Sequence, residues 1–81
     1  MTHEKVTFII NGTDVEVTVP AGAMLRDAVA RALEISHSSP HRSWHVRDNR
    51  GITLPQDQPV GRFHFGDERL FLMPDIGAGG S

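Results

Sequence analysis

The chain has 81 residues, a formal net charge of −2 and no cysteine. This length accommodates one small domain, and the lack of cysteine excludes disulfides, thiolate metal sites and a cysteine nucleophile. A small domain without disulfides predicts a cytoplasmic location, the slightly acidic charge argues against a nucleic-acid partner, and the absence of a long apolar run argues against a membrane partner.

The first predicted element is a β-hairpin, KVTFII-NG-TDVEVTV. Its Asn-Gly pair at positions 11–12 is typical of a two-residue type I′ turn, and such a turn sets the pairing register of both strands. The predicted pairs are Ile10–Thr13, Phe8–Val15 and Val6–Val17. The apolar members share one face, which Val19 extends, whereas the opposite face is polar except for Ile9. We therefore expect an antiparallel pair that is covered on one side.

Residues 24–35 predict an amphipathic helix, because their apolar side chains recur at intervals of three and four positions. The residues on this apolar face are Leu25, Ala28, Val29, Ala32 and Leu33. No Ser, Thr or Asp precedes the helix as a cap, and Gly22 is an acceptable substitute. The start of the helix is therefore less well defined by the sequence than its buried face.

The next segment, SHSSPHRS at residues 36–43, has the composition of a loop. His37, His41 and His45 follow one another at a spacing of four, which on a helix suits zinc binding. Pro40 interrupts any helix there, and the stretch contains no carboxylate. We therefore interpret the histidines as loop residues and expect no metal site.

Residues 44–47 alternate in polarity and predict a third strand, with Trp44 in the core. The turn DNRG and a short fourth strand at residues 52–54 follow it. The next stretch contains two prolines and two glycines, which predicts an irregular crossing with a single helical turn. Three of its apolar side chains are expected to fill the core: Val60, Phe63 and Phe65.

The segment ERLFLMP at residues 68–74 predicts the last strand, with Leu70 and Leu72 pointing inward. Alternation along the strand then places Arg69, Phe71 and Met73 on the opposite side. An exposed Phe next to Met is typical of a partner contact, although partial cover by a neighbouring segment is an equal alternative.

These elements predict an α+β domain at residues 1–74, with one helix packed on a mixed four- to five-stranded sheet. The closing strand must pair near the first strand and parallel to it, so that both apolar faces are buried. Residues 75–81, DIGAGGS, lack a periodic apolar pattern and predict a flexible tail.

The chain resembles ubiquitin in the order and spacing of its segments. The resemblance is closer to the small bacterial ubiquitin-like proteins that accompany activating-enzyme, conjugating-enzyme and metallopeptidase homologues. The matching segments are the hairpin VTFIINGTDVEVTV, the helix MLRDAVARALEI, the strand pair WHVRD and GITL, and ERLFLMP followed by Gly-Gly. The resemblance implies the β-grasp fold, and it implies that His45, Phe71 and Met73 belong to a docking patch on the outer sheet surface.

The resemblance also implies a protein modifier that is activated at Gly79-Gly80. A partner activating enzyme would use ATP to adenylate the Gly80 carboxylate and would hold it as a thioester, and a conjugating enzyme would help to join it to target proteins through an isopeptide bond or a similar linkage. Because Ser81 converts that carboxylate to an amide, a processing peptidase, such as a zinc metallopeptidase, must first cleave between Gly80 and Ser81. Glycines suit this role, since they lack a Cβ and admit close approach by an enzyme.

Two alternatives stay open. One is a sulfur carrier of the same fold that uses a Gly80 thiocarboxylate, and the other is a non-conjugated ubiquitin-like interaction module. No catalytic set is apparent, so we expect neither an enzyme nor a cofactor of its own. Lys5 is the single lysine and lies on the polar face of the first strand. It is the candidate acceptor lysine for chain building, and modification by single copies is the simpler expectation.

Overall fold

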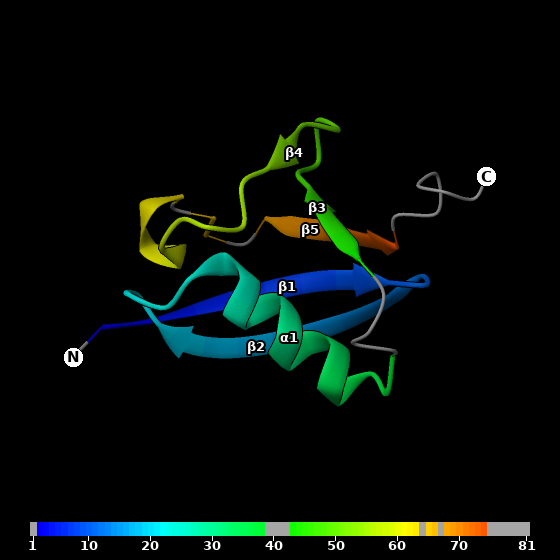
Figure 1. Cartoon of the computed structure of the whole chain (residues 1–81), viewed down its shortest axis with the longest axis horizontal. Coiled ribbons are helices and arrows are strands. Elements are labelled where there is room, and N and C mark those ends of the chain that lie inside the picture. Colours follow the sequence, from blue (N-terminus) through cyan, green and yellow to red (C-terminus); the bar gives the residue numbers. More distant parts are fainter. Residues whose placement is uncertain (1, 39–42, 64, 67, 75–81) are drawn as a thin grey trace.

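The computed structural model describes residues 2–38, 43–63, 65–66 and 68–74. They form a five-stranded mixed sheet with one helix packed against one of its faces (Figure 1). In chain order the elements are β1 (His3–Ile10), β2 (Thr13–Pro20), α1 (Leu25–Ile35), β3 (Trp44–Arg47), β4 (Thr53–Leu54), the 3₁₀ turn η1 (Val60–Arg62) and β5 (Arg69–Pro74). The predicted α+β arrangement of one helix on a mixed sheet is confirmed.

The strands lie in the order β2-β1-β5-β3-β4. The first and last strands, β1 and β5, are parallel neighbours, as the sequence predicted. All other neighbouring strands run antiparallel. The sheet therefore has two edges, the long strand β2 and the two-residue strand β4.

The β1–β2 hairpin has the predicted register, with Phe8 opposite Val15 and Ile10 opposite Thr13. Asn11 and Gly12 adopt φ angles of 52° and 80°, the left-handed conformations that a type I′ turn requires. The strand begins two residues earlier than predicted, at His3. All six apolar side chains assigned to the inner face are buried: Val6, Phe8, Ile10, Val15, Val17 and Val19.

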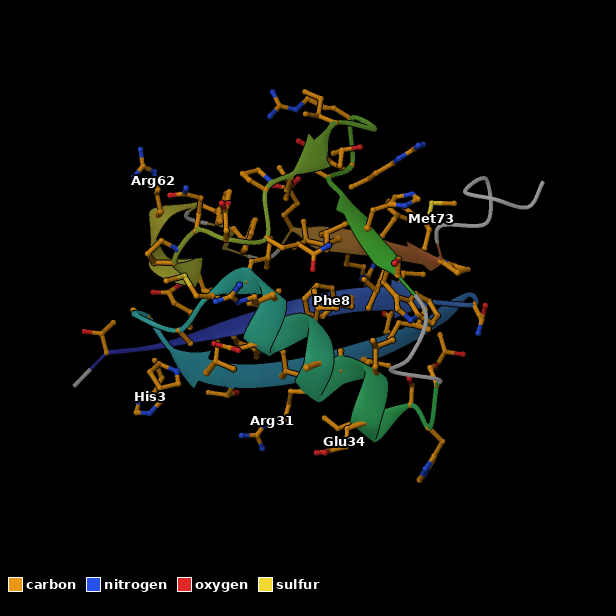
Figure 2. The ribbon with its side chains drawn as sticks, in the orientation of Figure 1. His3, Phe8, Arg31, Glu34, Arg62 and Met73 are labelled. Carbon is orange, nitrogen blue, oxygen red and sulfur yellow. The ribbon has the colours of Figure 1, made fainter. Side chains whose placement is uncertain are left out.

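The core lies between the sheet and α1. Phe8, Leu25 and Leu70 are fully buried there and come from β1, α1 and β5. Figure 2 shows Phe8 between the helix and the strands, whereas Arg31 and Glu34 point from the helix toward solvent. All five helix residues predicted to face the core are buried, so the periodic pattern identified the correct face.

The N-terminus of α1 is capped by a segment that lies far away in the sequence. The helix begins at Leu25, one residue later than predicted, with Met24 and not Gly22 at the N-cap position. The Leu25 N–H donates to the Gln58 carbonyl at 2.9 Å, and the Arg26 N–H donates to the Gln56 carbonyl at 3.0 Å. These carbonyls satisfy amides that have no partner within the helix, so no capping Ser, Thr or Asp is needed.

The turn between β3 and β4 is organised by Asp48, a buried residue that is 5% exposed. Its Oδ1 accepts hydrogen bonds from the Arg50 N–H at 2.9 Å and the Ile52 N–H at 3.0 Å. The hydrogen bond from Ile52 is the main cause that lowers the pKa of Asp48, and Arg50 contributes through its N–H and its charge. The fourth strand contains only Thr53–Leu54, because the Ile52 amide belongs to this turn.

The crossing between β4 and β5 contains one 3₁₀ turn, where the sequence predicted a single helical turn. Val60 is buried, as predicted. Phe63 and Phe65 are only partly buried against the core, and their rings stack on each other with centroids 5.1 Å apart. Trp44 is likewise partly buried against the core. In the part of the chain that the structure describes, no helix is long and apolar enough to cross a membrane.

Candidate functional site

The face of the sheet opposite α1 exposes two large apolar side chains of β5. Phe71 is 40% exposed and Met73 is 43% exposed, whereas Leu70 and Leu72 between them are buried. The predicted alternation along this strand is therefore confirmed. Figure 2 shows Met73 on the side of the sheet away from the helix.

Strand pairing gives these two residues defined neighbours. Because β5 lies between β1 and β3, Phe71 is paired with Ile9 on one side and with Arg47 on the other. Met73 is paired with His45 of β3. We call these five residues the Phe71 surface: Ile9, His45, Arg47, Phe71 and Met73. The surface has an apolar centre and one cationic side chain, which suits contact with another protein.

The sequence prediction identified three members of the Phe71 surface and missed Ile9 and Arg47. Ile9 carried a signal, since it is the one apolar residue on the otherwise polar face of the hairpin. Arg47 carried none, because its position beside Phe71 depends on the register between β3 and β5. That register joins segments far apart in the sequence.

A shallow groove of about 240 Å³ adjoins the Phe71 surface. It lies where the β1–β2 turn meets the end of β5. Its lining residues are Ile9, Asn11, Gly12, Phe71, Leu72, Met73 and Pro74. Since β5 ends at Pro74, the groove adjoins the point from which the predicted tail continues. A partner seated on the Phe71 surface is therefore close to the start of the tail.

His45 is half-buried, and its Nε2 atom is enclosed without a hydrogen-bond partner among the described residues. The prediction that His45 lies beside Met73 on the outer face is confirmed by the strand register. The ring is less accessible than an outward-pointing strand residue was expected to be. An unsatisfied enclosed nitrogen is uncommon in folded proteins, and here it lies within the Phe71 surface.

Lys5 lies on the same outer face, toward the start of β1. Its Nζ is 3.9 Å from Glu16 Oε2, and the two side chains are 60% and 62% exposed. Beside this pair, Arg69 Nε contacts Asp14 Oδ2 at 3.2 Å. The amine of Lys5 is accessible from solvent, as an acceptor lysine requires.

Several predicted site residues lie outside the described residues. These are Gly79, Gly80 and Ser81, which the sequence assigned to activation and processing, and also His41. Of the remaining loop histidines, His37 follows α1 and His45 belongs to β3. Within the described ranges, no group of three or more His, Asp or Glu side chains is arranged to hold a metal ion.

The fold and this surface define a small α+β domain with an uncovered, partly apolar sheet face. Residues 2–81 match the family described as Protein of Unknown function (DUF2604), and the chain belongs to that family. No curated protein matches the chain.

Proposed function

We propose that the chain is a ubiquitin-like protein modifier with a β-grasp fold. The observation that supports this most strongly is the position of the first and last strands. β1 and β5 are parallel neighbours, with β2 beyond β1 and β3 beyond β5. A single helix follows the β1–β2 hairpin and packs on the inner face. This is the strand order that the resemblance to ubiquitin implies.

The proposed chemistry takes place at Gly80. A peptidase first hydrolyses the Gly80–Ser81 bond and frees the Gly80 carboxylate. That carboxylate attacks the α-phosphorus of ATP on an activating enzyme, with release of pyrophosphate. A cysteine thiolate of the enzyme then displaces AMP to form a thioester. A target amine or hydroxyl finally displaces the thiolate, and an amide or ester bond joins the modifier to its target. This chain contains no cysteine, so the thioester belongs to its partner.

The Phe71 surface supports the proposal because only a short stretch of chain separates it from Gly80. Six residues, 75–80, separate the end of β5 from the reacting carboxylate. Fully extended, they span at most about 20–22 Å. An enzyme that binds the Phe71 surface can therefore receive Gly80 if its active site lies within this distance of the end of β5. In this proposal the surface binds the activating enzyme and presents the tail to it.

Exposure of Phe71 and Met73 also supports a second candidate function. In a non-conjugated interaction module, the Phe71 surface binds a partner protein and the tail takes no part in chemistry. A sulfur carrier differs from both, since its Gly80 carboxylate becomes a thiocarboxylate. Each of the three functions predicts a different intact mass for the protein isolated from cells.

The test is an intact-mass measurement on protein purified from its native host. The modifier requires a free species that ends at Gly80, together with covalent conjugates. A species in which one sulfur replaces one oxygen supports the carrier. An uncleaved chain without conjugates supports the interaction module and contradicts conjugation.

A matched pair of variants tests the assignment of Gly80. In chains that lack Ser81, Gly80→Ala is expected to abolish the adduct that forms with the activating enzyme and ATP and that is released by a thiol. Gly77→Ala, the same change three residues earlier, is expected to retain it. If Gly80→Ala forms the adduct as efficiently as the unmodified chain, Gly80 is not the activated residue.

A further inference from the structure

We propose that Met73 is a site of reversible oxidation by peroxides, and that its sulfoxide accepts a hydrogen bond from Nε2–H of His45. The modification adds a polar group to the Phe71 surface and weakens the binding of a partner there. Three observations support the site: the exposure of Met73, its place in the Phe71 surface, and the unsatisfied nitrogen beside it. Only the effect on partner binding rests on the proposed function.

The reaction at Met73 requires a peroxide and no catalytic group of the chain. The thioether sulfur attacks one oxygen of the peroxide, the O–O bond breaks, and the sulfur keeps that oxygen as a sulfoxide. The sulfur is oxidised by two electrons, and the peroxide is reduced to water or to an alcohol. A methionine sulfoxide reductase restores the thioether, so the modification is reversible. A cysteine thiolate would compete for the peroxide, but this chain has no cysteine.

The first observation is the exposure of Met73. Among the described residues, four large apolar side chains are exposed: Ile35 of α1, Ile52 of the β3–β4 turn, Phe71 and Met73. Met73 is 43% exposed, and of these four it alone contains a sulfur atom. Met24, the other described methionine, is half-buried at the N-cap of α1, where its backbone forms a β-bridge with Pro59. A peroxide therefore reaches Met73 more readily than Met24.

The second observation is the place of Met73 in the Phe71 surface. Alternation along β5 places Phe71 and Met73 on the same face of the sheet, and both also line the shallow groove at the end of the strand. Figure 2 shows Met73 on the side of the sheet away from the helix. A thioether is apolar and flexible and suits an apolar contact, whereas a sulfoxide is polar. Covering the sulfoxide oxygen with an apolar partner is unfavourable, so oxidation weakens that contact.

The third observation is the unsatisfied nitrogen of His45. This residue of β3 is the register partner of Met73, and its Nε2 atom is enclosed without a hydrogen-bond partner among the described residues. Directly opposite residues on neighbouring strands have Cβ atoms about 4.5–5.5 Å apart. Because the Met73 sulfur is separated from its Cβ by a single methylene, an oxygen on that sulfur lies within reach of the His45 ring. The neutral Nε2–H tautomer and the imidazolium both present a donor there.

The hydrogen bond between the sulfoxide and His45 has two consequences. It gives a partner to an enclosed nitrogen that the weakly accepting thioether leaves unsatisfied. It also holds the Met73 side chain against β3, so that this side chain no longer adapts to the surface of a partner. The sulfoxide is therefore favoured in the free protein, whereas a bound partner favours the thioether.

The site is tested on the full-length chain treated with hydrogen peroxide, which catalase then removes. Cleavage after Lys and Arg leaves the methionines at positions 1, 24 and 73 in three separate peptides, which mass spectrometry quantifies. Oxygen is expected to be added to Met73 at least about fivefold faster than to Met24. A methionine sulfoxide reductase with a thiol is expected to reverse the addition. Equal rates at Met73 and Met24 would overturn the assignment of the site.

The hydrogen bond is tested by ¹⁵N–¹H correlation spectra of the imidazole rings before and after oxidation. The Nε2 resonance of His45 is expected to shift, and its proton to exchange more slowly with solvent, whereas the exposed rings of His3 and His37 are expected to be unaffected. Met73→Leu keeps the side-chain volume but has no sulfur, so the same treatment should leave its His45 resonances unchanged. Unchanged His45 resonances in the oxidised unmodified chain would exclude the hydrogen bond.

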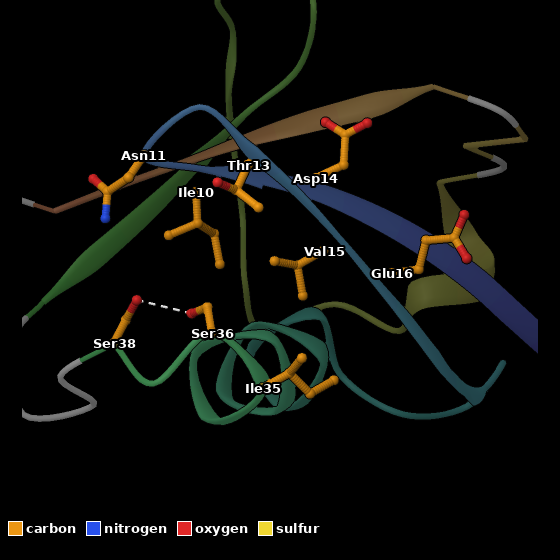
Figure 3. A pocket seen from close by; sticks show the side chains of 9 residues that line it. All are labelled: Ile10, Asn11, Thr13, Asp14, Val15, Glu16, Ile35, Ser36 and Ser38. Carbon is orange, nitrogen blue, oxygen red and sulfur yellow. Dashed lines mark hydrogen bonds between the residues drawn. The ribbon is translucent and has the colours of Figure 1, made fainter.

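The effect on binding is measured with chains that lack Ser81, as the rate at which the thiol-sensitive adduct forms with the activating enzyme and ATP. Oxidation is expected to lower this rate about tenfold or more in the unmodified chain and to leave it unchanged in Met73→Leu. The double variant Met73→Leu/Ile35→Met moves the exposed methionine to the groove between β2 and α1, where Figure 3 shows Ile35. Oxidation of this variant is expected to leave the rate unchanged.

The results separate this inference from the proposed function. If the unoxidised chain forms the adduct and oxidation slows the unmodified chain and the double variant equally, regulation through Met73 is wrong and the modifier proposal stands. If the unoxidised chain forms no adduct, the modifier proposal is contradicted and the effect on its activating enzyme is excluded with it. The peptide masses and the His45 resonances decide the oxidation site in either case, because neither measurement involves Gly80.

Discussion

Phe71 of β5 is the register partner of Ile9 of β1, on the face of the sheet that α1 leaves uncovered. Two large apolar side chains therefore lie next to each other near the middle of the sheet. Neither is fully buried, since Phe71 is 40% exposed and Ile9 is half-buried. Pairs of aromatic and β-branched residues on neighbouring strands contribute only about 0.2–1 kcal/mol to stability. The pair thus contributes little to the stability of the fold, and its exposure leaves it accessible to the partner proposed for the Phe71 surface.

Phe71→Ala is expected to separate binding from stability. The free energy of unfolding should fall by about 1 kcal/mol, because much of the ring is already in contact with water. Formation of the thiol-sensitive adduct with the activating enzyme should decrease about tenfold or more, as for a central aromatic contact. Urea unfolding and a gel assay of the adduct measure the two effects. Ile52→Ala is the control, and equal losses of adduct in both variants would exclude the Phe71 surface as the docking site.

Phe8→Ala makes the same chemical change on the buried face of the sheet. Phe8 is fully buried, so its truncation should lower the free energy of unfolding by about 3–5 kcal/mol. Small domains have total stabilities near the lower end of about 5–15 kcal/mol, so the variant should be close to unfolding. Urea unfolding of Phe8→Ala and Phe71→Ala under the same conditions compares the two faces. A similar loss in both variants would contradict the assignment of the core.

Asp48 should make stability depend on pH in the acid range. Its pKa in the folded protein is lowered from the ordinary value of 3.8, chiefly by the hydrogen bond from Ile52. Above 3.8 the carboxylate is charged in both states, and its hydrogen bonds favour the folded state. Below 3.8 the unfolded chain takes up the proton first, so this contribution falls and disappears once the folded carboxylate is protonated.

Asp48→Asn is therefore expected to be less stable than the unmodified chain at neutral pH. The difference should become smaller at pH values below 3.8. Urea unfolding across this range measures it. Asp57→Asn, at an exposed position in the crossing, is the control for the loss of one negative charge. If the difference in stability between Asp48→Asn and the unmodified chain stays constant with pH, the charge of the Asp48 carboxylate is not its cause, and the changed hydrogen-bonding geometry of the side chain is.

Gln56 should stabilise the domain through its side chain. Its Nε2 donates to the Trp44 carbonyl at 2.7 Å, and it thereby ties the crossing to the start of β3. Gln56→Ala should lower the free energy of unfolding by about 0.5–1.5 kcal/mol. Gln58→Ala is the matched control, because Gln58 also caps α1 with its backbone carbonyl but has no side-chain hydrogen bond to another described residue. Equal effects of the two changes, measured by thermal unfolding, would argue against the Gln56 bond.

Lys5→Arg tests whether the modifier forms chains through its single lysine. Arginine preserves the positive charge beside Glu16 and removes the nucleophilic amine. If single copies are attached, the pattern of conjugates on an immunoblot should be the same for both proteins. Loss of a ladder of larger conjugates in the variant would show instead that Lys5 is an acceptor for polymers.

The parts of the fold that the sequence predicted well are those set by local rules. The Asn11-Gly12 turn determined the hairpin register, and helical periodicity identified the buried face of α1. Alternation in β5 likewise placed Phe71 and Met73 on the outer face. Each of these features depends on residues within a few positions of one another, so the pattern alone contains the necessary information.

Most of the features that the sequence did not predict depend on distant segments, and the role of Asp48 is the local exception. The cap of α1 comes from the carbonyls of Gln56 and Gln58, and backbone groups leave no trace in residue identity. The burial of Asp48 follows from local hydrogen bonds to Arg50 and Ile52, a role that the turn sequence DNRG permits but does not require. The inclusion of Ile9 and Arg47 in the Phe71 surface required the register of β5 with its two neighbouring strands. The conjugation role of Gly79 and Gly80 stays a prediction.

The adjacency of β1 and β5 has a consequence for biosynthesis. β1 is translated well before β5, its neighbour on one side in the sheet. Until β5 has been translated, Phe8 lacks Leu70, its register partner across β1 and β5. A nascent or prematurely terminated chain is thus an incomplete globule that chaperones and proteases can recognise. Only a chain read through Pro74 acquires the finished sheet, so every folded copy has been translated up to the point where the segment proposed for attachment begins.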